Sequence, residues 1–208
     1  HPGVTAMFVL GAGADQNPYP RRELDLAKQH GRALSNAVET ALLHGGKPLS
    51  GPLVSLLEHV TLDYAHVPTK AELEQALNSK QALERRHAET LLKKLAESGQ
   101  LSANYEIPVQ VVRFGKDLAL IAVAGEVVVD YSLRLKRELS GPAIWFAGYS
   151  NEVFGYLPSR RVSEEGGYEP VDSIRYSTHT SPWALSTEER VIGKAKELFG
   201  RTGMAVGE

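Results

Sequence analysis

The apolar and polar positions of this chain alternate in short runs that predict strands and helices in mixed order. The predicted strands cover residues 5–10, 53–64, 108–114, 118–123 and 143–147, which are rich in β-branched and aromatic residues. The run 118–123 is apolar at every position, as expected for a strand in the middle of a sheet. Residues 115–117, Gly-Lys-Asp, fit a hairpin loop that joins it to the preceding strand.

Apolar residues at helical spacing predict the helices, over 22–44, 68–101, 127–139 and 187–200. Ala27 and Gly31 suggest that the first helix packs closely against a neighbouring backbone. Region 68–101 is interpreted as a helical excursion over the domain surface, because its charged residues of both signs are balanced. The tail 201–208 is expected to fray. The pattern indicates one α/β domain over 1–208, with a mixed sheet flanked by helices.

Three of the predicted strands, 5–10, 118–124 and 143–147, are each followed directly by a polar or glycine-containing loop. We expect them to lie in one sheet with their carboxyl ends on the same side, where α/β proteins place their chemistry. This arrangement would bring Asp15, Glu126 and Asn151 to a common site. The strand pattern starts almost at His1, so the chain is expected to begin within a domain and to need another segment to cover its sheet.

Composition narrows the classes of function. A formal net charge of −2, with charges of both signs interspersed, favours neither nucleic acid nor an anionic membrane as partner. The absence of cysteine excludes disulfides, thiolate metal sites and a cysteine nucleophile. No apolar run is long enough for a transmembrane segment. The seven histidines form no His-Glu-x-x-His or His-x-His motif, so they do not make a zinc site by themselves.

The chemistry is expected in the stretch 125–169. Glu126 follows the most apolar strand directly, and its carboxylate needs a partner, which is an arginine, a backbone nest or a metal. The loop that begins at Gly148 carries Asn151 and is followed by Tyr156 and Tyr168. The alternative is that these tyrosines cover the edge of the core with their hydroxyls in water. A dinucleotide-binding loop at 11–16 is disfavoured, because Gln16 stands where the third glycine belongs.

Three motifs together resemble the neutral, non-lysosomal ceramidase family, especially its shorter bacterial members. Residues 8–18 resemble the strand and Gly-Asp-x-Ser-Pro loop of the family, Gly125-Glu126 resembles its Gly-Glu zinc segment, and 148–169 resembles its Gly-x-x-Asn…Tyr…Tyr-Glu loop. Twelve residues separate Tyr156 from Tyr168, the spacing expected for the tyrosines of the family. The resemblance covers nearly the whole chain, as the second half of a larger ceramidase-like catalytic domain.

The resemblance implies a zinc-dependent amidohydrolase that acts on an N-acyl amide or ceramide-like lipid in the periplasm or outside the cell. Glu126 and Tyr156 would lie at the metal, and Tyr168 would contact the amide or oxyanion. Asn151 would shape the pocket wall, and together with Tyr168 and Asp15 it is expected to form the catalytic group. The zinc histidines of the family lie upstream of the matching region, so this chain alone is expected to hold zinc weakly or not at all. A missing N-terminal half or a partner subunit would supply them.

Besides the missing histidines, the resemblance is incomplete in a second respect. Gly11 and Ala12 stand where the family has a serine near the start of the loop, and so a serine-dependent role in amide recognition is absent. The alternative function is therefore a non-catalytic ceramidase-like subunit that serves as a structural or interaction module.

Overall fold

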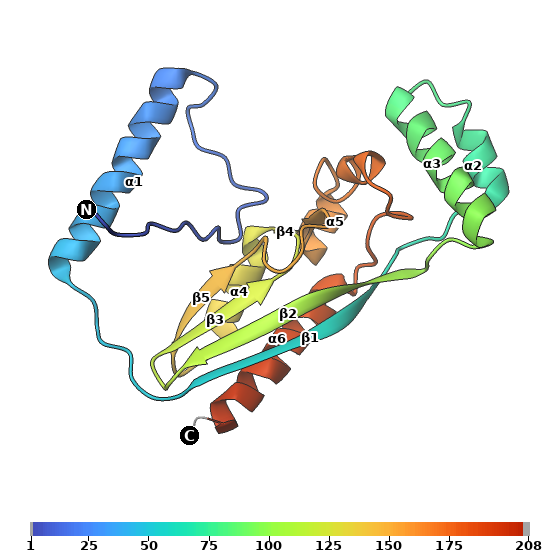
Figure 1. The fold of residues 1–208 in the computed structure, drawn as a ribbon. Helices are drawn as coiled ribbons and strands as arrows, with labels where there is room; N and C mark the ends of the chain where they lie inside the picture. The colour runs from blue at the N-terminus through green and yellow to red at the C-terminus, as the bar shows by residue number, and fades with distance from the viewer. Residues whose placement is uncertain (1, 206–208) are drawn as a thin grey trace.

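The computed structural model describes residues 2–205, which are built on a four-stranded mixed sheet in the order β1-β2-β3-β5 (Figure 1). The long strands β1 (Leu53–Asp63) and β2 (Asn104–Phe114) are antiparallel, and β3 (Leu118–Val123) pairs antiparallel with β2. β5 (Ala143–Ala147) lies parallel to β3. The expected α/β class, with a mixed sheet flanked by helices, is confirmed.

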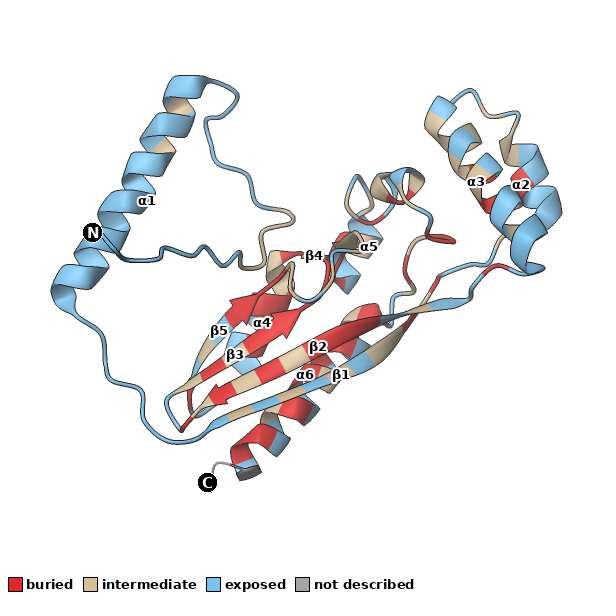
Figure 2. Cartoon of the chain, viewed as in Figure 1, coloured by how far each residue is buried: buried red, intermediate tan, exposed pale blue. Residues whose placement is uncertain are grey.

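Two helices cover one face of this sheet. α4 (Val129–Glu138) connects β3 with β5, and α6 (Thr187–Ala205) packs against β1 and β2. On β2 and β3 the alternating residues that point toward these helices are buried, whereas those of β1 from Val54 to Val60 are half-buried. Buried and less buried residues accordingly alternate along β2 (Figure 2). The core side chains with no exposed surface include Ile107, Val109, Val111, Ile121, Val123, Leu135 and Leu198. Burial of this one face holds the two helices on the sheet.

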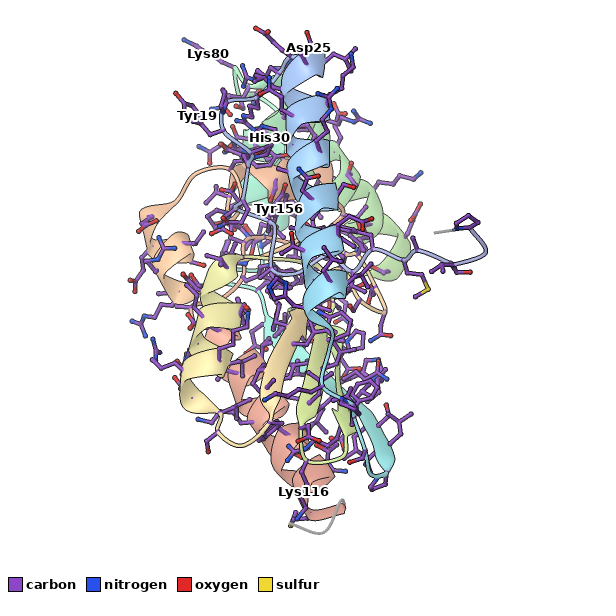
Figure 3. All side chains as sticks on the ribbon, turned by 90° about the vertical axis from the view of Figure 1, so that its left-hand side faces the viewer. Tyr19, Asp25, His30, Lys80, Lys116 and Tyr156 are labelled. Carbon is purple, nitrogen blue, oxygen red and sulfur yellow. The ribbon has the colours of Figure 1, made fainter. Side chains whose placement is uncertain are left out.

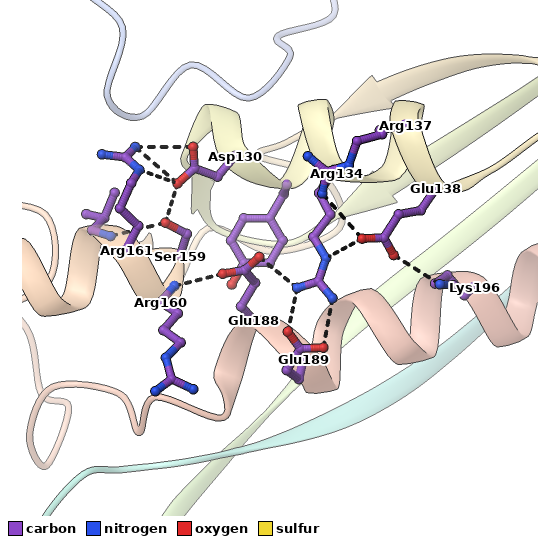
Figure 4. Close-up of polar contacts among 12 residues, drawn as sticks. Asp130, Arg134, Arg137, Glu138, Ser159, Arg160, Arg161, Glu188, Glu189 and Lys196 are labelled. Atoms are coloured by element: carbon purple, nitrogen blue, oxygen red, sulfur yellow. Dashed lines mark hydrogen bonds and ion pairs between the residues drawn. The ribbon is translucent and has the colours of Figure 1, made fainter.

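Ion pairs tie these helices to a short helix α5 (Arg160–Glu165) beside them (Figure 4). Arg134 of α4 donates to Glu138 in its own helix at 2.8 Å, and to Glu188 and Glu189 at the start of α6 at 2.8 and 2.6 Å. The side chain of Arg134 is only 20% exposed, so these bonds are screened less than ordinary surface pairs. The cluster fixes α4 against α6 below the loops that carry the candidate site.

The helical excursion consists of α2 (Lys70–Ala76) and α3 (Ala82–Ser98). Thr69 begins α2 with a capping box that it forms with Glu72, which is the reason the helix starts there. The two helices pack on each other through a small apolar cluster of their own, made of Leu73, Ala88, Leu91 and Leu101. They project from the far end of the β1–β2 ladder (Figure 1).

Three expectations about the ends of the chain are wrong. Residues 5–10 form no strand, because no neighbouring strand pairs with them among the described residues. α1 (Leu24–His44) is a helix, but none of its residues is buried, so it does not pack against another backbone here. The last helix does not end near 200: α6 continues through 201–205, and residues 206–208 lie outside the described part.

A further correction concerns the helix predicted over 127–139. Glu126 and Val127 form a two-residue strand, β4, which pairs in parallel with β6 (Tyr156–Leu157). The helix therefore begins only at Val129. Val127 is β-branched and fully buried, and pairing with another strand suits such a residue better than the first turn of a helix. Among the described residues, no helix has the length and apolar character needed to cross a membrane.

Candidate functional site

The candidate site is centred on Glu126 and Tyr156, which face each other in the β4–β6 pair. The amide of Glu126 donates to the carbonyl of Gly155 at 2.7 Å, which fixes the two strands at the point where the side chains leave them. The tight turn before Glu126 needs glycine, since Gly125 has φ +80° and a Cβ there would lie 2.7 Å from the Phe154 ring. The sequence therefore brings a carboxylate and a phenol side by side.

Tyr149 is a third member of this group, and sequence reasoning did not single it out. Its hydroxyl donates to Oε2 of Glu126 at 3.3 Å. Burial and the Glu126 carboxylate raise the pKa of Tyr149, and the same two causes raise the pKa of Tyr156 to about 12. Both phenols are therefore protonated at neutral pH and act as hydrogen-bond donors toward the carboxylate.

The loop that presents Tyr149 has an unusual backbone. Tyr149 and Asn151 have φ values of 53° and 67°, a left-handed conformation that costs a non-glycine residue roughly 1–2 kcal/mol. The Tyr149 amide donates to the carbonyl of Gly125 at 2.9 Å, and the Ser150 amide donates to that of Val123 at 3.2 Å. These bonds hold the loop over the carboxyl end of β3, and strained backbone of this kind is common at functional sites.

Tyr168 closes the group from the other side of a cavity of about 250 Å³. Its ring meets the ring of Tyr156 edge-on, with 5.6 Å between the centroids. Figure 3 views the molecule from the side of α1, and Tyr156 lies behind that helix in the body of the molecule. The cavity is lined by Glu126, Tyr156, Tyr168, Ser173, Tyr176, His179 and neighbouring apolar groups. The structure thus brings together Glu126, Tyr156 and Tyr168, three of the five residues expected at the site.

Asp15 and Asn151 lie near this group but make other contacts. Oδ1 of Asp15 accepts a hydrogen bond from the backbone amide of Val129 at 2.9 Å, so its carboxylate caps the positive end of α4. The side-chain amide of Asn151 donates to Gln110 at 3.2 Å. Neither residue lines the cavity beside Glu126. Asp15 still contributes to the negative potential that raises the pKa of Tyr149.

His179 is a second residue at the site, after Tyr149, that sequence reasoning did not single out. Its Nε2 donates to the carbonyl of Phe154 at 2.9 Å, and its Nδ1 therefore accepts from the hydroxyl of Tyr64, at 2.7 Å. Burial lowers the pKa of His179, which keeps this tautomer neutral. The rings of Phe154 and Trp183 pack around it, and His179 thereby supports the turn that leads into Tyr156.

Comparison with solved structures finds a match that spans almost the whole chain. The crystal structure of neutral ceramidase from Pseudomonas aeruginosa superposes with a TM-score of 0.58 and 16% sequence identity, over 95% of this chain. This chain has a ceramidase-like fold. The match spans only 35% of the length of the neutral ceramidase chain. No protein-family model matches the sequence, and no curated protein matches it either.

Proposed function

We propose that this chain forms the carboxylate- and tyrosine-bearing part of a zinc-dependent amide hydrolase that resembles neutral ceramidase and acts on an N-acyl amide or ceramide-like lipid. The observation that carries the proposal is the convergence of Glu126, Tyr156 and Tyr168 on one cavity, in a fold similar to that of a neutral ceramidase. The similarity in fold supports a hydrolase of this type, and the side chains support the position of its site.

The residues of this chain do not fit a complete zinc site. Catalytic zinc normally takes three protein ligands and keeps one position open. Within residues 2–205, no three His, Asp or Glu side chains are close enough to share a metal. Glu126, with the phenols of Tyr149 and Tyr156 beside it, supplies only part of a donor set. The remaining ligands, histidines by resemblance, would come from the rest of a ceramidase-like protein, and bound zinc would polarise the amide carbonyl there.

The residues of this chain would hold the Glu126 carboxylate and orient a bound amide. They would not complete the metal site by themselves. The hydroxyl of Tyr149 donates to Glu126, which keeps the carboxylate in one position and leaves its charge directed toward the cavity. Tyr168 is about half exposed at the mouth of the cavity, so its hydroxyl can reach a bound amide from the solvent side. A phenol in that place would donate a hydrogen bond to the oxygen on which negative charge develops.

Hydrolysis of a fluorescent N-acyl sphingosine tests this proposal, with the chain produced together with the coding sequence that flanks it. Glu126→Gln should abolish activity, and Glu164→Gln is the matched control, because Glu164 lies exposed on α5, where it pairs with Arg160. Tyr168→Phe should lower kcat by about 10²-fold if it donates to the oxyanion. Wild-type activity in Glu126→Gln would overturn the proposal. Assembly without hydrolysis of any N-acyl substrate would favour the non-catalytic subunit instead.

A further inference from the structure

The two faces of the sheet are buried to very different extents. Strand residues that point toward α4 and α6, such as Val109 and Ile121, have no exposed surface. On the opposite face Leu57 and Trp145 are each 44% exposed, and Leu53 is 67% exposed. No helix or strand of the described residues packs extensively on this second face (Figure 2). Ala122 and Ala147, at one end of the face, are only 5% and 2% exposed, so the uncovered part lies toward Leu53 and Trp145. An uncovered apolar sheet face indicates a surface that another chain segment normally buries.

The composition of this face supports that interpretation. Three neighbouring rows of residues run across all four strands in register, and together they define the outer sheet face. It consists of Leu53, Phe114, Leu118 and Ala143, of Ser55, Val112, Leu120 and Trp145, and of Leu57, Gln110, Ala122 and Ala147. None of these residues is charged. The two polar ones bond to each other, since the Gln110 side chain donates to Ser55 at 2.9 Å. The face can therefore leave water without exposing an unsatisfied polar group.

Its size decides what can dock there. With about 4.8 Å between strands and about 6.7 Å between successive residues on one face, the outer sheet face covers roughly 400 Å². A stable protein interface buries about 800 Å² on each partner, so two copies that met only through this face would fall short. The occupant must engage more of the molecule.

α1 and the segment 4–10 supply the additional area. Met7 and Phe8 are 84% and 74% exposed, and Leu34, Val38 and Leu42 leave a helical apolar stripe of α1 uncovered. Figure 1 shows the ribbon of α1 standing apart from the sheet. One side of α1 is about 31 Å long and about 10 Å wide and adds about 300 Å², and the extended segment 4–10 adds about 200 Å². The available area rises to roughly 900 Å², enough for a stable interface.

We propose that the outer sheet face, α1 and residues 4–10 form one docking surface for the remaining part of a ceramidase-like polypeptide. The inference rests on the proposed function for the identity of the occupant, because neutral ceramidase has a chain of which only 35% is matched here. The occupant presents an uncharged apolar face to the sheet, since an unpaired charge buried against Val112 and Leu120 would lose its hydration without a partner.

Single cysteines test the surface directly, because the chain has none of its own. Leu57→Cys places a thiol on the outer sheet face, and Leu133→Cys is the matched control on α4, where Leu133 is 57% exposed outside the docking surface. In the 208-residue chain alone, both thiols should react with a maleimide at similar rates. In the chain produced with its flanking coding sequence, labelling of Leu57→Cys should slow by at least about tenfold while Leu133→Cys is unchanged.

Equal labelling of Leu57→Cys in the two forms would overturn the proposal, as would failure of the flanking product to associate with the chain. Protection that appears in the isolated chain and rises with its concentration would assign the surface to a second copy and would also overturn it. The result is independent of catalysis, because Glu126 lies outside the surface. The Leu57→Cys thiol could be protected, also in the Glu126→Gln background, while the wild type hydrolyses no substrate. That result would refute the proposed function and leave the docking surface standing.

Discussion

Replacing Gly125 with alanine should be the most disruptive small change near the candidate site. Gly125 has φ +80°, so any side chain there incurs the cost of a left-handed backbone. A Cβ would lie 2.7 Å from two carbons of the Phe154 ring and 2.9 Å from the carbonyl oxygen of Gly155. That oxygen accepts the amide of Glu126, so relief of the contact must move either the ring or the strand pair that positions Glu126.

The magnitude follows from these two effects. The left-handed backbone costs about 1–2 kcal/mol for alanine. The Phe154 ring is confined by Tyr105, His179 and Trp183, whose ring centroids lie 5.6 to 5.8 Å away, so it has little room to retreat. Overpacking of this kind typically costs about 1–3 kcal/mol. Gly125→Ala should therefore lower the free energy of unfolding by roughly 2–5 kcal/mol, a large part of the stability of an ordinary domain.

Urea unfolding followed by circular dichroism measures this loss. Gly193→Ala is the control, because Gly193 lies in the interior of α6 and a Cβ there would meet no atom within 4 Å. That change should stabilise the protein by up to about 1 kcal/mol through helix propensity. If the free energy of unfolding of Gly125→Ala lies within about 0.5 kcal/mol of the wild-type value, the turn at Gly125 does not constrain the position of Glu126.

Three further outcomes are expected in unfolding experiments. Asp15→Ala should lower the stability of the protein by about 1 kcal/mol, because the Val129 amide loses its acceptor. Asp15→Asn should cost less, because an amide oxygen still accepts this hydrogen bond, and equal losses would contradict the capping role. Arg134→Met should cost about 1–3 kcal/mol by releasing α4 from α6, and a neutral result would show that the pairs are solvated. The lowered pKa of His179 means that the unfolded chain binds more protons, so stability should fall as pH drops below about 6.5. His179→Gln should flatten that pH dependence, and an unchanged slope would exclude His179 as its source.

The central strands could be predicted because their apolar patterns are long enough to show a period. The strand 118–123 and the strand 143–147 were placed correctly and lie parallel in one sheet. The same reasoning failed for 5–10, whose apolar side chains are mostly exposed. For α1 the periodicity identified an apolar side but not what covers it. Apolar patterning shows which residues should be buried, whereas pairing depends on the rest of the protein.

The candidate site was predicted in part, for a different reason. Glu126 was expected at the site because it directly follows the most apolar strand, and motif resemblance then grouped it with Tyr156 and Tyr168. The contact of Glu126 with Tyr156 depends on two strands of two residues each, which are too short for any periodicity. His179 could not be found in this way, because the residues that it bonds, Tyr64 and Phe154, lie 115 and 25 positions away. A lone histidine among serines and threonines gives no local signal of burial.

The zinc content of the purified protein shows whether Glu126 belongs to a metal site. The chain produced with its flanking coding sequence should retain one tightly held zinc after dialysis, because that sequence is expected to complete the donor set begun by Glu126 and Tyr156. Glu126→Gln should lower the retained zinc sharply, since it removes the carboxylate ligand, and Glu164→Gln should not. The 208-residue chain alone should retain little. One equivalent of zinc in the isolated chain, or unchanged zinc in Glu126→Gln, would contradict the account.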